Sequence, residues 1–360
     1  MKSGVTTVVD RPRASSRLKV WGSSACRALR KVPVHPQDVM PSPDARSVPL
    51  ERRLVIACAI GLLAGALTFV HMGPGRFYGD FFYPWFAARL FQHGYDPYLA
   101  IPGTGIHPLS TPFAYPLPAV LAALPFSWLS FPLGSGLFFG ACSAVLAYGL
   151  TRDGYYRLPL FLSAPFIGAA LQAQWSPLVM IPAVIPALGF LAVLKPNLGL
   201  AVAAYRPTWW LLLGCIVLVA ISLVIMPIWP LHWWQNVHRL PGHGSALLAP
   251  GGLLIVLAAL RWRHPDGRLL LMMAIVPQVL FWYDQLPLLL IPRTFRESLI
   301  LTLASNVGIA AWGAQYYSAR PEVFGPAAAP YIIGSLYLPA LLMVLLRRGQ
   351  LPVALRDAAA

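Results

Sequence analysis

Long apolar runs recur along most of this chain. Each run of about 18–20 residues is long enough to cross a hydrocarbon layer about 30 Å thick. Hydrophobic residues make up 58% of the 360 positions and charged residues only 11%, which lies outside the range of ordinary globular proteins. The short alternating segments of a membrane β-barrel are not seen. We therefore expect an all-α, polytopic membrane protein with about ten to eleven transmembrane helices.

The apolar runs divide the chain into a tail, one membrane domain and a second tail. Residues 1–51 are rich in Ser, Pro, Arg and Val without a helical period, so we expect a disordered basic tail. The membrane domain is predicted over residues 52–348, and residues 349–360 form a short C-terminal tail. The predicted spans are 54–72, 158–171, 177–194, 209–228, 246–260, 269–282, 299–316 and 331–346, with an apolar region at 113–150 that crosses an odd number of times or contains a re-entrant half.

The formal net charge of +15 is distributed as in a membrane protein rather than a nucleic-acid-binding one. Lys and Arg crowd the N-terminal tail and return at the ends of apolar runs, as at Arg52-Arg53 and Arg347-Arg348. This distribution follows the bias of cytoplasmic segments towards positive charge. We expect a multi-pass protein of the plasma membrane with both tails in the cytoplasm, membrane lipids as partners and no nucleic acid partner.

This orientation places a large first loop, residues 73–118, outside the cytoplasm. The loop is rich in aromatic residues and carries two aspartates, two histidines and two arginines, so its length calls for a functional reason. Residues 81–93 predict a short interfacial helix with Asp80 at its N-cap and Gly94 near its end. A carboxylate at this position is also a candidate general base for an acceptor hydroxyl. The two roles of Asp80 are compatible.

Other polar positions on the predicted outer face are candidates for substrate contact, each with a simpler alternative. Asp96 precedes Pro97, where aspartate commonly forms a turn. A second outer loop, residues 227–245, carries His238, Arg239 and His243, which are suited to binding a phosphate. Its tryptophans fit the aromatic belt of a membrane interface.

Three polar residues interrupt or flank the later apolar runs. Gln174 and Asp284 lie near the predicted outer ends of spans, where polar groups must find partners or line a wet cavity. Lys195 lies at a predicted cytoplasmic boundary, where snorkelling of its side chain explains it.

Several chemistries are excluded by missing motifs. The chain has no phosphate-binding GxxxxGK[ST] loop, no GxGxxG fingerprint, no HExxH and no GxSxG. The four cysteines show no metal-ligand spacing. We expect no bound cofactor and no resident metal site, and a divalent-metal requirement stays open. An enzyme working on the outer face has no access to cytosolic nucleotide sugars, so its sugar donor must arrive on a lipid.

An ordered set of short motifs carries a family resemblance over roughly residues 54–303 of the chain. The motifs are Gly79-Asp80, Gly94-Tyr95-Asp96-Pro97-Tyr98, Phe113-Ala114-Tyr115-Pro116-Leu117-Pro118, Gln174, Leu194-Lys195-Pro196-Asn197 and Trp282-Tyr283-Asp284. In this order they resemble glycosyltransferase family 87, which includes polyprenyl-phosphate-mannose-dependent α-mannosyltransferases with the GT-C membrane fold. The chain departs from the family at Ala173-Gln174, where Gly-Gln is usual, at Leu117, where a second proline is frequent, and at Tyr283-Asp284-Gln285, near which relatives place a histidine.

The resemblance implies a polyprenyl-phosphate sugar donor and a glycolipid or glycan acceptor at the outer face of the plasma membrane. It makes Asp80 the catalytic aspartate. The remaining expected substrate-binding residues are Asp96, Tyr98, Tyr115, Gln174, His238, His243 and Asp284. A single base suits this chemistry, because a phosphate leaves readily and needs no protonation by a second carboxylic acid.

The leading hypothesis is therefore a membrane hexosyltransferase, with mannose as the expected sugar. The alternatives are a transporter or flippase of lipid-linked sugars, which would share broken helices and polar residues near the midplane, and a non-catalytic scaffold for envelope enzymes. No matching interruptions appear in two halves of the sequence, as a transporter built on repeats would show.

Overall fold

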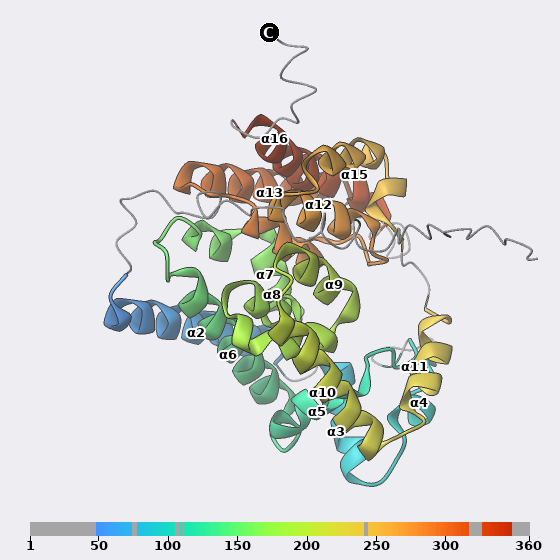
Figure 1. Cartoon of the computed structure of the whole chain (residues 1–360). Coiled ribbons are helices and arrows are strands. Elements are labelled where there is room, and N and C mark those ends of the chain that lie inside the picture. The colour runs from blue at the N-terminus through green and yellow to red at the C-terminus, as the bar shows by residue number, and fades with distance from the viewer. Residues whose placement is uncertain are drawn as a thin grey trace, which may run out of the picture. The chain divides into compact units, whose positions relative to one another are not determined.

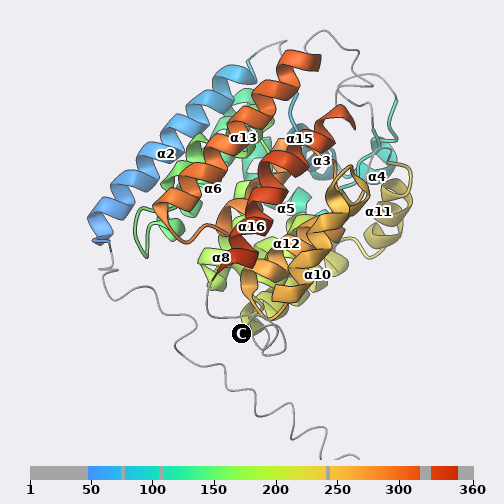
Figure 2. The ribbon, with the colours of Figure 1, turned by 90° about the horizontal axis from the view of Figure 1, so that it is seen from above.

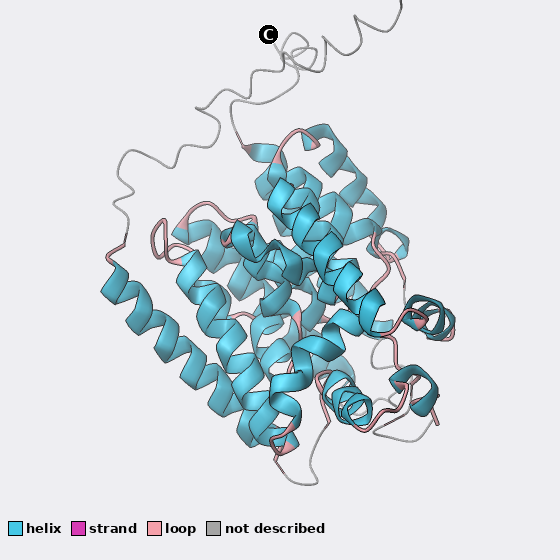
Figure 3. Ribbon diagram, turned by 60° about the horizontal axis from the view of Figure 1, so that its bottom comes forward, coloured by secondary structure: helices cyan, strands magenta, loops and turns pink. Residues whose placement is uncertain are grey.

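The computed structural model describes residues 48–73, 78–104, 109, 111–240, 244–316 and 326–347. The chain divides into two units after residue 45, and the first unit lies outside the described residues. The described part consists of helices joined by loops (Figure 1, Figure 3). Its β-type pairing is limited, within these ranges, to one bridge between Gly244 and Gln278. The predicted all-α class is confirmed.

The helices follow one another in two groups along the chain. The first group is α2 (Leu50–His71), α3 (Phe82–Gln92), α4 (Pro97–Ala100), α5 (Leu117–Ser127), α6 (Phe131–Leu150), η2 (Leu158–Leu162), α7 (Ala164–Leu171), α8 (Ser176–Val184), η3 (Pro186–Leu194) and α9 (Pro196–Tyr205). The second group is α10 (Trp209–Ile225), α11 (Trp229–Val237), η4 (Ala246–Leu248), η5 (Gly252–Arg261), α12 (Pro265–Ile275), η6 (Trp282–Leu290), α13 (Phe295–Tyr316), η7 (Pro326–Ala328), α15 (Ala329–Ile332), the π-helical η8 (Ile333–Tyr337) and α16 (Leu338–Leu346).

Within the described ranges, three helices are long and apolar enough to cross a membrane: α2, α6 and the continuous helix Ala329–Leu346. A fourth candidate is the pair α10 and α11, which is bent by 105° at its break. Several other predicted spans are built from short helices, as in the 158–171 run, which consists of η2 and the eight-residue α7. A helix of eight residues is only about 12 Å long. Length and composition therefore support three to four spans.

Helices α2 and α6 lie beside each other because glycines face glycines (Figure 1, Figure 2). A Cβ atom on Gly65 would lie 2.8 Å from the carbonyl oxygen of Gly136, and one on Gly140 would lie 2.8 Å from that of Gly61. Along each helix the two glycines are four residues apart, Gly61 and Gly65 in α2 and Gly136 and Gly140 in α6. This is the small-xxx-small spacing that lets membrane helices approach closely. The sequence contained this signal in both helices.

The predicted single span at 177–194 is wrong. The segment forms two short helices, α8 and η3, which pack against each other. A straight helix of 18 residues would separate its ends by about 27 Å. Instead Lys195 returns to Gln174, with 3.0 Å between Nζ and Oε1. Pro182, inside α8, and Pro186, at the start of η3, flank the reversal, since proline interrupts helical hydrogen bonding.

The apolar region 113–150 is also divided. It contains the 11-residue α5, which packs against α3, and the long α6. One membrane-length helix in this region agrees with the predicted odd number of crossings. The predicted helix at 81–93 is confirmed as α3, with Gly94 following its end at a φ of 80°.

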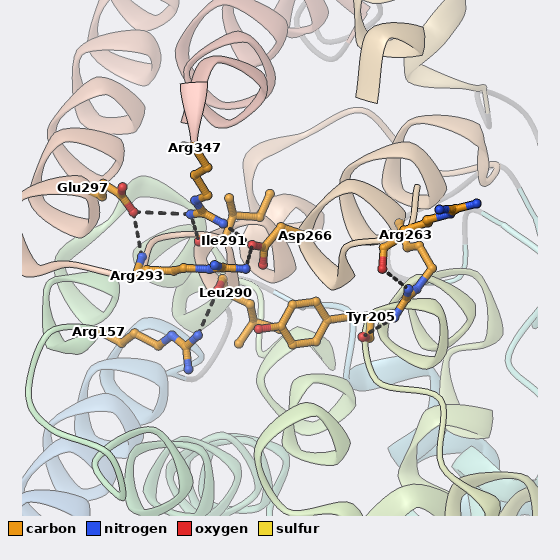
Figure 4. Close-up of polar contacts among 10 residues, drawn as sticks. Arg157, Tyr205, Arg263, Asp266, Leu290, Ile291, Arg293, Glu297 and Arg347 are labelled. Atoms are coloured by element: carbon orange, nitrogen blue, oxygen red, sulfur yellow. Dashed lines mark hydrogen bonds and ion pairs between the residues drawn. The ribbon is translucent and has the colours of Figure 1, made fainter. Parts of the chain in front are cut away.

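Arginines gather where several helices end, and Figure 4 shows the central group. Asp266, a buried carboxylate in the first turn of α12, accepts from Arg293 at 2.8 Å and from Arg347. Arg347 also donates to the carbonyl of Ile291 at 2.5 Å, and Arg157 donates to that of Leu290 at 3.1 Å. Cations suit the negative ends of helix dipoles. We call this group the Asp266 cluster.

Candidate active site

Lys195 brings together side chains from four distant parts of the chain. Its Nζ lies 2.7 Å from Oδ1 of Asp284, 3.0 Å from Oε1 of Gln174 and 3.6 Å from Oδ2 of Asp80. The hydroxyl of Tyr115 donates to the same Oδ2 of Asp80 at 2.5 Å. We call these five residues the Lys195 cluster.

The cluster forms where helices begin. Lys195 immediately precedes α9, Asp284 lies in the first turn of η6, and Gln174 lies in the break before α8. The N-terminal end of a helix carries a partial positive charge and unpaired N–H groups. Residues at or beside three helix starts therefore meet in the Lys195 cluster, and the dipoles of these helices favour negative charge there.

Close backbone contacts hold these helix starts together. The backbone N–H of Asp80 donates to the carbonyl of Gln172 at 2.7 Å, and the hydroxyl of Ser176 donates to the carbonyl of Tyr283 at 2.7 Å. A Cβ atom at Gly79 would lie 2.2 Å from that Gln172 oxygen, so only glycine allows this approach. Between these contacts Ala173 has a φ of 46°, a conformation that favours glycine.

The charges in the cluster differ in their exposure. The side chain of Asp284 is 4% exposed and that of Lys195 is 12% exposed, whereas that of Asp80 is 33% exposed. Burial alone would lower the pKa of Lys195, but the carboxylates of Asp284 and Asp80 outweigh it and raise the pKa above its ordinary value. Lys195 is therefore an ammonium cation, held tightly by Asp284 and loosely by the more accessible Asp80.

Asp80 is not the N-cap of α3, and that prediction is wrong. The cap position is Phe81, without a side-chain cap bond. The carboxylate of Asp80 instead turns to Tyr115 and Lys195, which provide a stronger donor and a positive charge. Aromatic rings support this arrangement, since Tyr115 packs on Trp175 at 5.7 Å between ring centroids and Trp175 packs on Phe138 at 4.7 Å.

Asp96 and Tyr98 lie outside the Lys195 cluster and are linked to it through Tyr115. Asp96 caps α4 by accepting from the backbone N–H of Tyr98 at 2.8 Å, which confirms the predicted turn-forming role. Its other oxygen lies 2.7 Å from Nδ1 of His232. The hydroxyl of Tyr98 donates to the carbonyl of Tyr115 at 3.0 Å. Burial, followed by the Asp96 carboxylate, raises the pKa of Tyr98, so this phenol stays protonated.

The predicted site residues are thus only partly brought together. Asp80, Tyr115, Gln174 and Asp284 meet in the Lys195 cluster. His238, the exposed C-cap residue of α11, bonds the carbonyl of Trp234 in that helix at 2.8 Å. His243 lies outside the described residues.

The cation of the cluster is what the sequence reasoning missed. Assigning Lys195 to snorkelling at a cytoplasmic boundary is wrong, because its Nζ is paired between two carboxylates beside Gln174. The available signal was a lone lysine after an apolar run, together with two polar interruptions, Gln174 and Asp284, that needed partners. Because α8 and η3 fold back on each other, Lys195 lies beside Gln174 and Asp284.

The Lys195 cluster lies at the starts of α9 and η6, and arginines, including Arg157 of the Asp266 cluster, contact the other ends of these helices. Helix α9 starts after Lys195, and the carbonyl of Ala204 near its end accepts from Arg268 at 2.7 Å. Helix η6 carries Asp284 in its first turn and ends at Leu290, which Arg157 contacts. Ten residues of α-helix extend about 15 Å. This length sets the approximate separation of the two clusters.

Within the described residues, no group of three His, Cys, Asp or Glu side chains is arranged to hold a metal ion. Compared with known proteins, the chain matches no family model, no curated sequence and no solved structure. The relation to glycosyltransferase family 87 is therefore a proposal based on motifs and on the geometry of the Lys195 cluster.

Proposed function

We propose that the chain is a membrane glycosyltransferase of GT-C type, resembling family 87, that moves a hexose from a polyprenyl-phosphate donor to a glycolipid or glycan acceptor. Mannose is the proposed sugar. The observation that carries this proposal is the pairing of a partly exposed carboxylate, Asp80, with a buried ammonium, Lys195, 3.6 Å away. One group is suited to accept a proton, and the other is suited to stabilise a departing phosphate.

The proposed reaction balances with these two groups. Asp80 takes the proton from the acceptor hydroxyl as the acceptor oxygen bonds to the anomeric carbon of the sugar. The bond between that carbon and the phosphate oxygen breaks, and the electron pair leaves with the polyprenyl phosphate. Lys195 and the three helix starts stabilise the added negative charge. A β-linked donor would then give an α-linked product.

The other members of the Lys195 cluster prepare these groups. Tyr115 fixes the carboxylate of Asp80 by a 2.5 Å hydrogen bond, leaving its other oxygen for the acceptor. Asp284 holds Lys195 at 2.7 Å and keeps it charged, so the lysine acts as a fixed cation rather than as a nucleophile. Gln174 bonds the same ammonium at 3.0 Å and sets its direction.

The proposed orientation follows the positive-inside bias. With the Asp266 cluster on the cytoplasmic side, the helix starts around Lys195 lie about 15 Å deeper, towards the outer leaflet. The short helices would complete about ten to eleven crossings of the plasma membrane. The donor phosphate would then reach Lys195 from the outer leaflet.

The test uses the protein in lipid nanodiscs with polyprenyl-phosphate-mannose and a panel of glycolipid acceptors. Asp80→Asn is expected to reduce transfer at least about a thousandfold while keeping the thermal midpoint within a few degrees. The matched control is Asp153→Asn, which changes an exposed carboxylate in the loop after α6 and leaves transfer unchanged. Near-normal turnover by the Asp80 variant would contradict the assigned base.

A transporter of lipid-linked sugars is the second candidate, favoured by one observation. Polar groups gather at the break between α7 and α8, as at the interrupted helices of secondary transporters. Movement of the lipid-linked sugar across liposomes, without covalent transfer to any acceptor, would support this candidate instead.

A further inference from the structure

Helix α11 has two faces of different character. Trp229 and Asn236 are buried on one face, with His232 and Trp233 partly buried beside them. On the other face, Leu231 is 51% exposed and Trp234 is 57% exposed, and Ile228, just before the helix, is 48% exposed. At 100° per residue the exposed apolar positions fall within an arc of about 120°.

The buried face holds the segment that carries Tyr115. The side-chain amide of Asn236 donates to the carbonyls of Phe113 and Tyr98, each at 3.0 Å. The indole N–H of Trp233 donates to the carbonyl of Ala114 at 2.8 Å. With the bond from Tyr98 to Tyr115, all three carbonyls of residues 113–115 are held. This segment directs the Tyr115 hydroxyl onto Asp80.

The exposed apolar face of α11 follows directly on an exposed apolar surface of α10. Nearly every side chain of α10 is at least partly exposed, and only Ser222 is buried. The chain turns by 105° between α10 and α11. If α10 crosses the bilayer, α11 lies close to the membrane plane. Ile, Leu and Trp on one face, followed by the exposed His238 and Arg239, match helices that lie in the headgroup region.

A second short element extends the same surface. Helix α4 lies beside α11 in Figures 1 and 2, and Asp96 at its start pairs with His232. Tyr95 is 61% exposed and Leu99 is 65% exposed. A surface made from both elements is therefore apolar and aromatic outside and hydrogen-bonded to the active-site loop inside.

We propose that α11 is a membrane-seated clamp. Its outer face binds the headgroup region of the bilayer, and its inner face fixes residues 113–115, so that lipid contact holds Tyr115 on Asp80. The last step, the consequence for Asp80 as a base, rests on the proposed glycosyltransferase function; the seating and the clamp do not.

The seating is tested with labels in vesicles. In a variant without native cysteines, a fluorescent label at Leu231→Cys is expected to be quenched by brominated lipids and shielded from aqueous iodide. The matched control is Asp153→Cys, whose exposed loop position is expected to show the opposite pattern. Equal access of iodide to both labels would overturn the proposed contact between α11 and the headgroup region of the bilayer.

The clamp is tested by hydrogen–deuterium exchange of the peptide containing residues 113–115. Asn236→Leu removes the one hydrogen bond that Asn236 makes to this segment, at the carbonyl of Phe113, and is expected to raise its exchange about fivefold. Gln235→Leu changes an exposed amide on the same helix and leaves exchange unchanged. Trp233→Phe, which keeps a ring and removes one N–H, is expected to give about fivefold and tests the same segment if the first variant does not fold. Unchanged exchange in either folded variant would overturn the clamp.

Two further measurements test whether bilayer contact by the outer face of α11 stabilises residues 113–115, which its inner face holds. Leu231→Asp in vesicles is expected to raise exchange in residues 113–115 as Asn236→Leu does; unchanged exchange would separate the clamp from the bilayer. If transfer is observed, Asn236→Leu lowers kcat in the wild-type background and has no further effect beside Tyr115→Phe. Additive losses would show a purely structural role. If the wild-type protein transfers sugar to no acceptor, the proposed function fails, and if Asp80→Asn stays active, the assignment of Asp80 as the base fails; in either case the exchange result still decides the clamp.

Discussion

Replacing Lys195 by methionine tests the cluster through its central charge. The change keeps much of the side-chain volume and removes the ammonium that neutralises Asp284, whose side chain is 4% exposed. Removing one partner of a buried ion pair costs about 3–5 kcal/mol, because the other charge is left uncompensated. The looser contact with Asp80, at 3.6 Å and with a carboxylate one-third exposed, adds at most about 1 kcal/mol.

The buried pair with Asp284 therefore dominates the expected loss, which is about 4 kcal/mol. At about 2–4 °C per kcal/mol for a chain of this size, the thermal midpoint should fall by about 10 °C. The assay is thermal unfolding in detergent, followed by intrinsic fluorescence and by the remaining monodisperse fraction.

The double variant Lys195→Met with Asp284→Leu provides the decisive comparison. Apolar residues often replace a buried ion pair without net loss, so most of the midpoint should return. Transfer should stay absent in the double variant, because the proposed phosphate partner is missing. A wild-type midpoint for the single variant would refute the ion pair. Failure of the double variant to recover would show that packing of the lysine stem, not charge, caused the loss.

Three further outcomes are expected in the same unfolding assay. Gly65→Ala places a Cβ 2.8 Å from a backbone carbonyl of α6 and should lower the midpoint, whereas Gly313→Ala meets open space and should raise stability by up to about 1 kcal/mol. Ala173 has a φ of 46°, so Ala173→Gly relieves about 1–2 kcal/mol of left-handed strain. This gain offsets the loss of the buried methyl group and the added entropy of the unfolded chain, so the free energy of unfolding should stay within about 0.5 kcal/mol. Ala169→Gly, inside α7, should cost about 1–2 kcal/mol. Because the pKa of Lys195 is raised on folding, its stabilising contribution should be fully present at and below its unfolded pKa and decline as pH rises through the higher folded value, seen as a shrinking difference from Lys195→Met above about pH 10.5.

Local sequence rules predicted local structure in the first loop well. The helix at 81–93 appears as α3, and the Asp96-Pro97 step forms the predicted capped turn. Both depend on residues within one turn of each other. The cap assigned to Asp80 was wrong because Tyr115 and Lys195, distant in sequence, bind the carboxylate instead.

Hydropathy could not predict the path of the chain through the membrane domain. An apolar run indicates burial or lipid contact, but it does not show whether the run crosses or turns back. The 177–194 run has the length of a span, yet it reverses between Pro182 and Pro186 and returns Lys195 to Gln174. The sequence indicated that Gln174 and Asp284 required partners, and Lys195 was the residue that only the fold could supply.

The Asp266 cluster also has a consequence for the order in which the chain is made. Asp266 and Arg293 are 27 residues apart, whereas Arg347 follows Asp266 by 81 residues. During synthesis Arg293 is therefore available to the Asp266 carboxylate well before Arg347, which follows α16. Arg347, just after α16, then contacts Ile291 after η6 and Asp266 in the first turn of α12, and its own carbonyl accepts from Arg261 at the end of η5 at 3.1 Å. A chain cut before Arg347 would therefore keep the ion pair between Asp266 and Arg293 but lose the contacts that Arg347 makes with Asp266, Ile291 and Arg261.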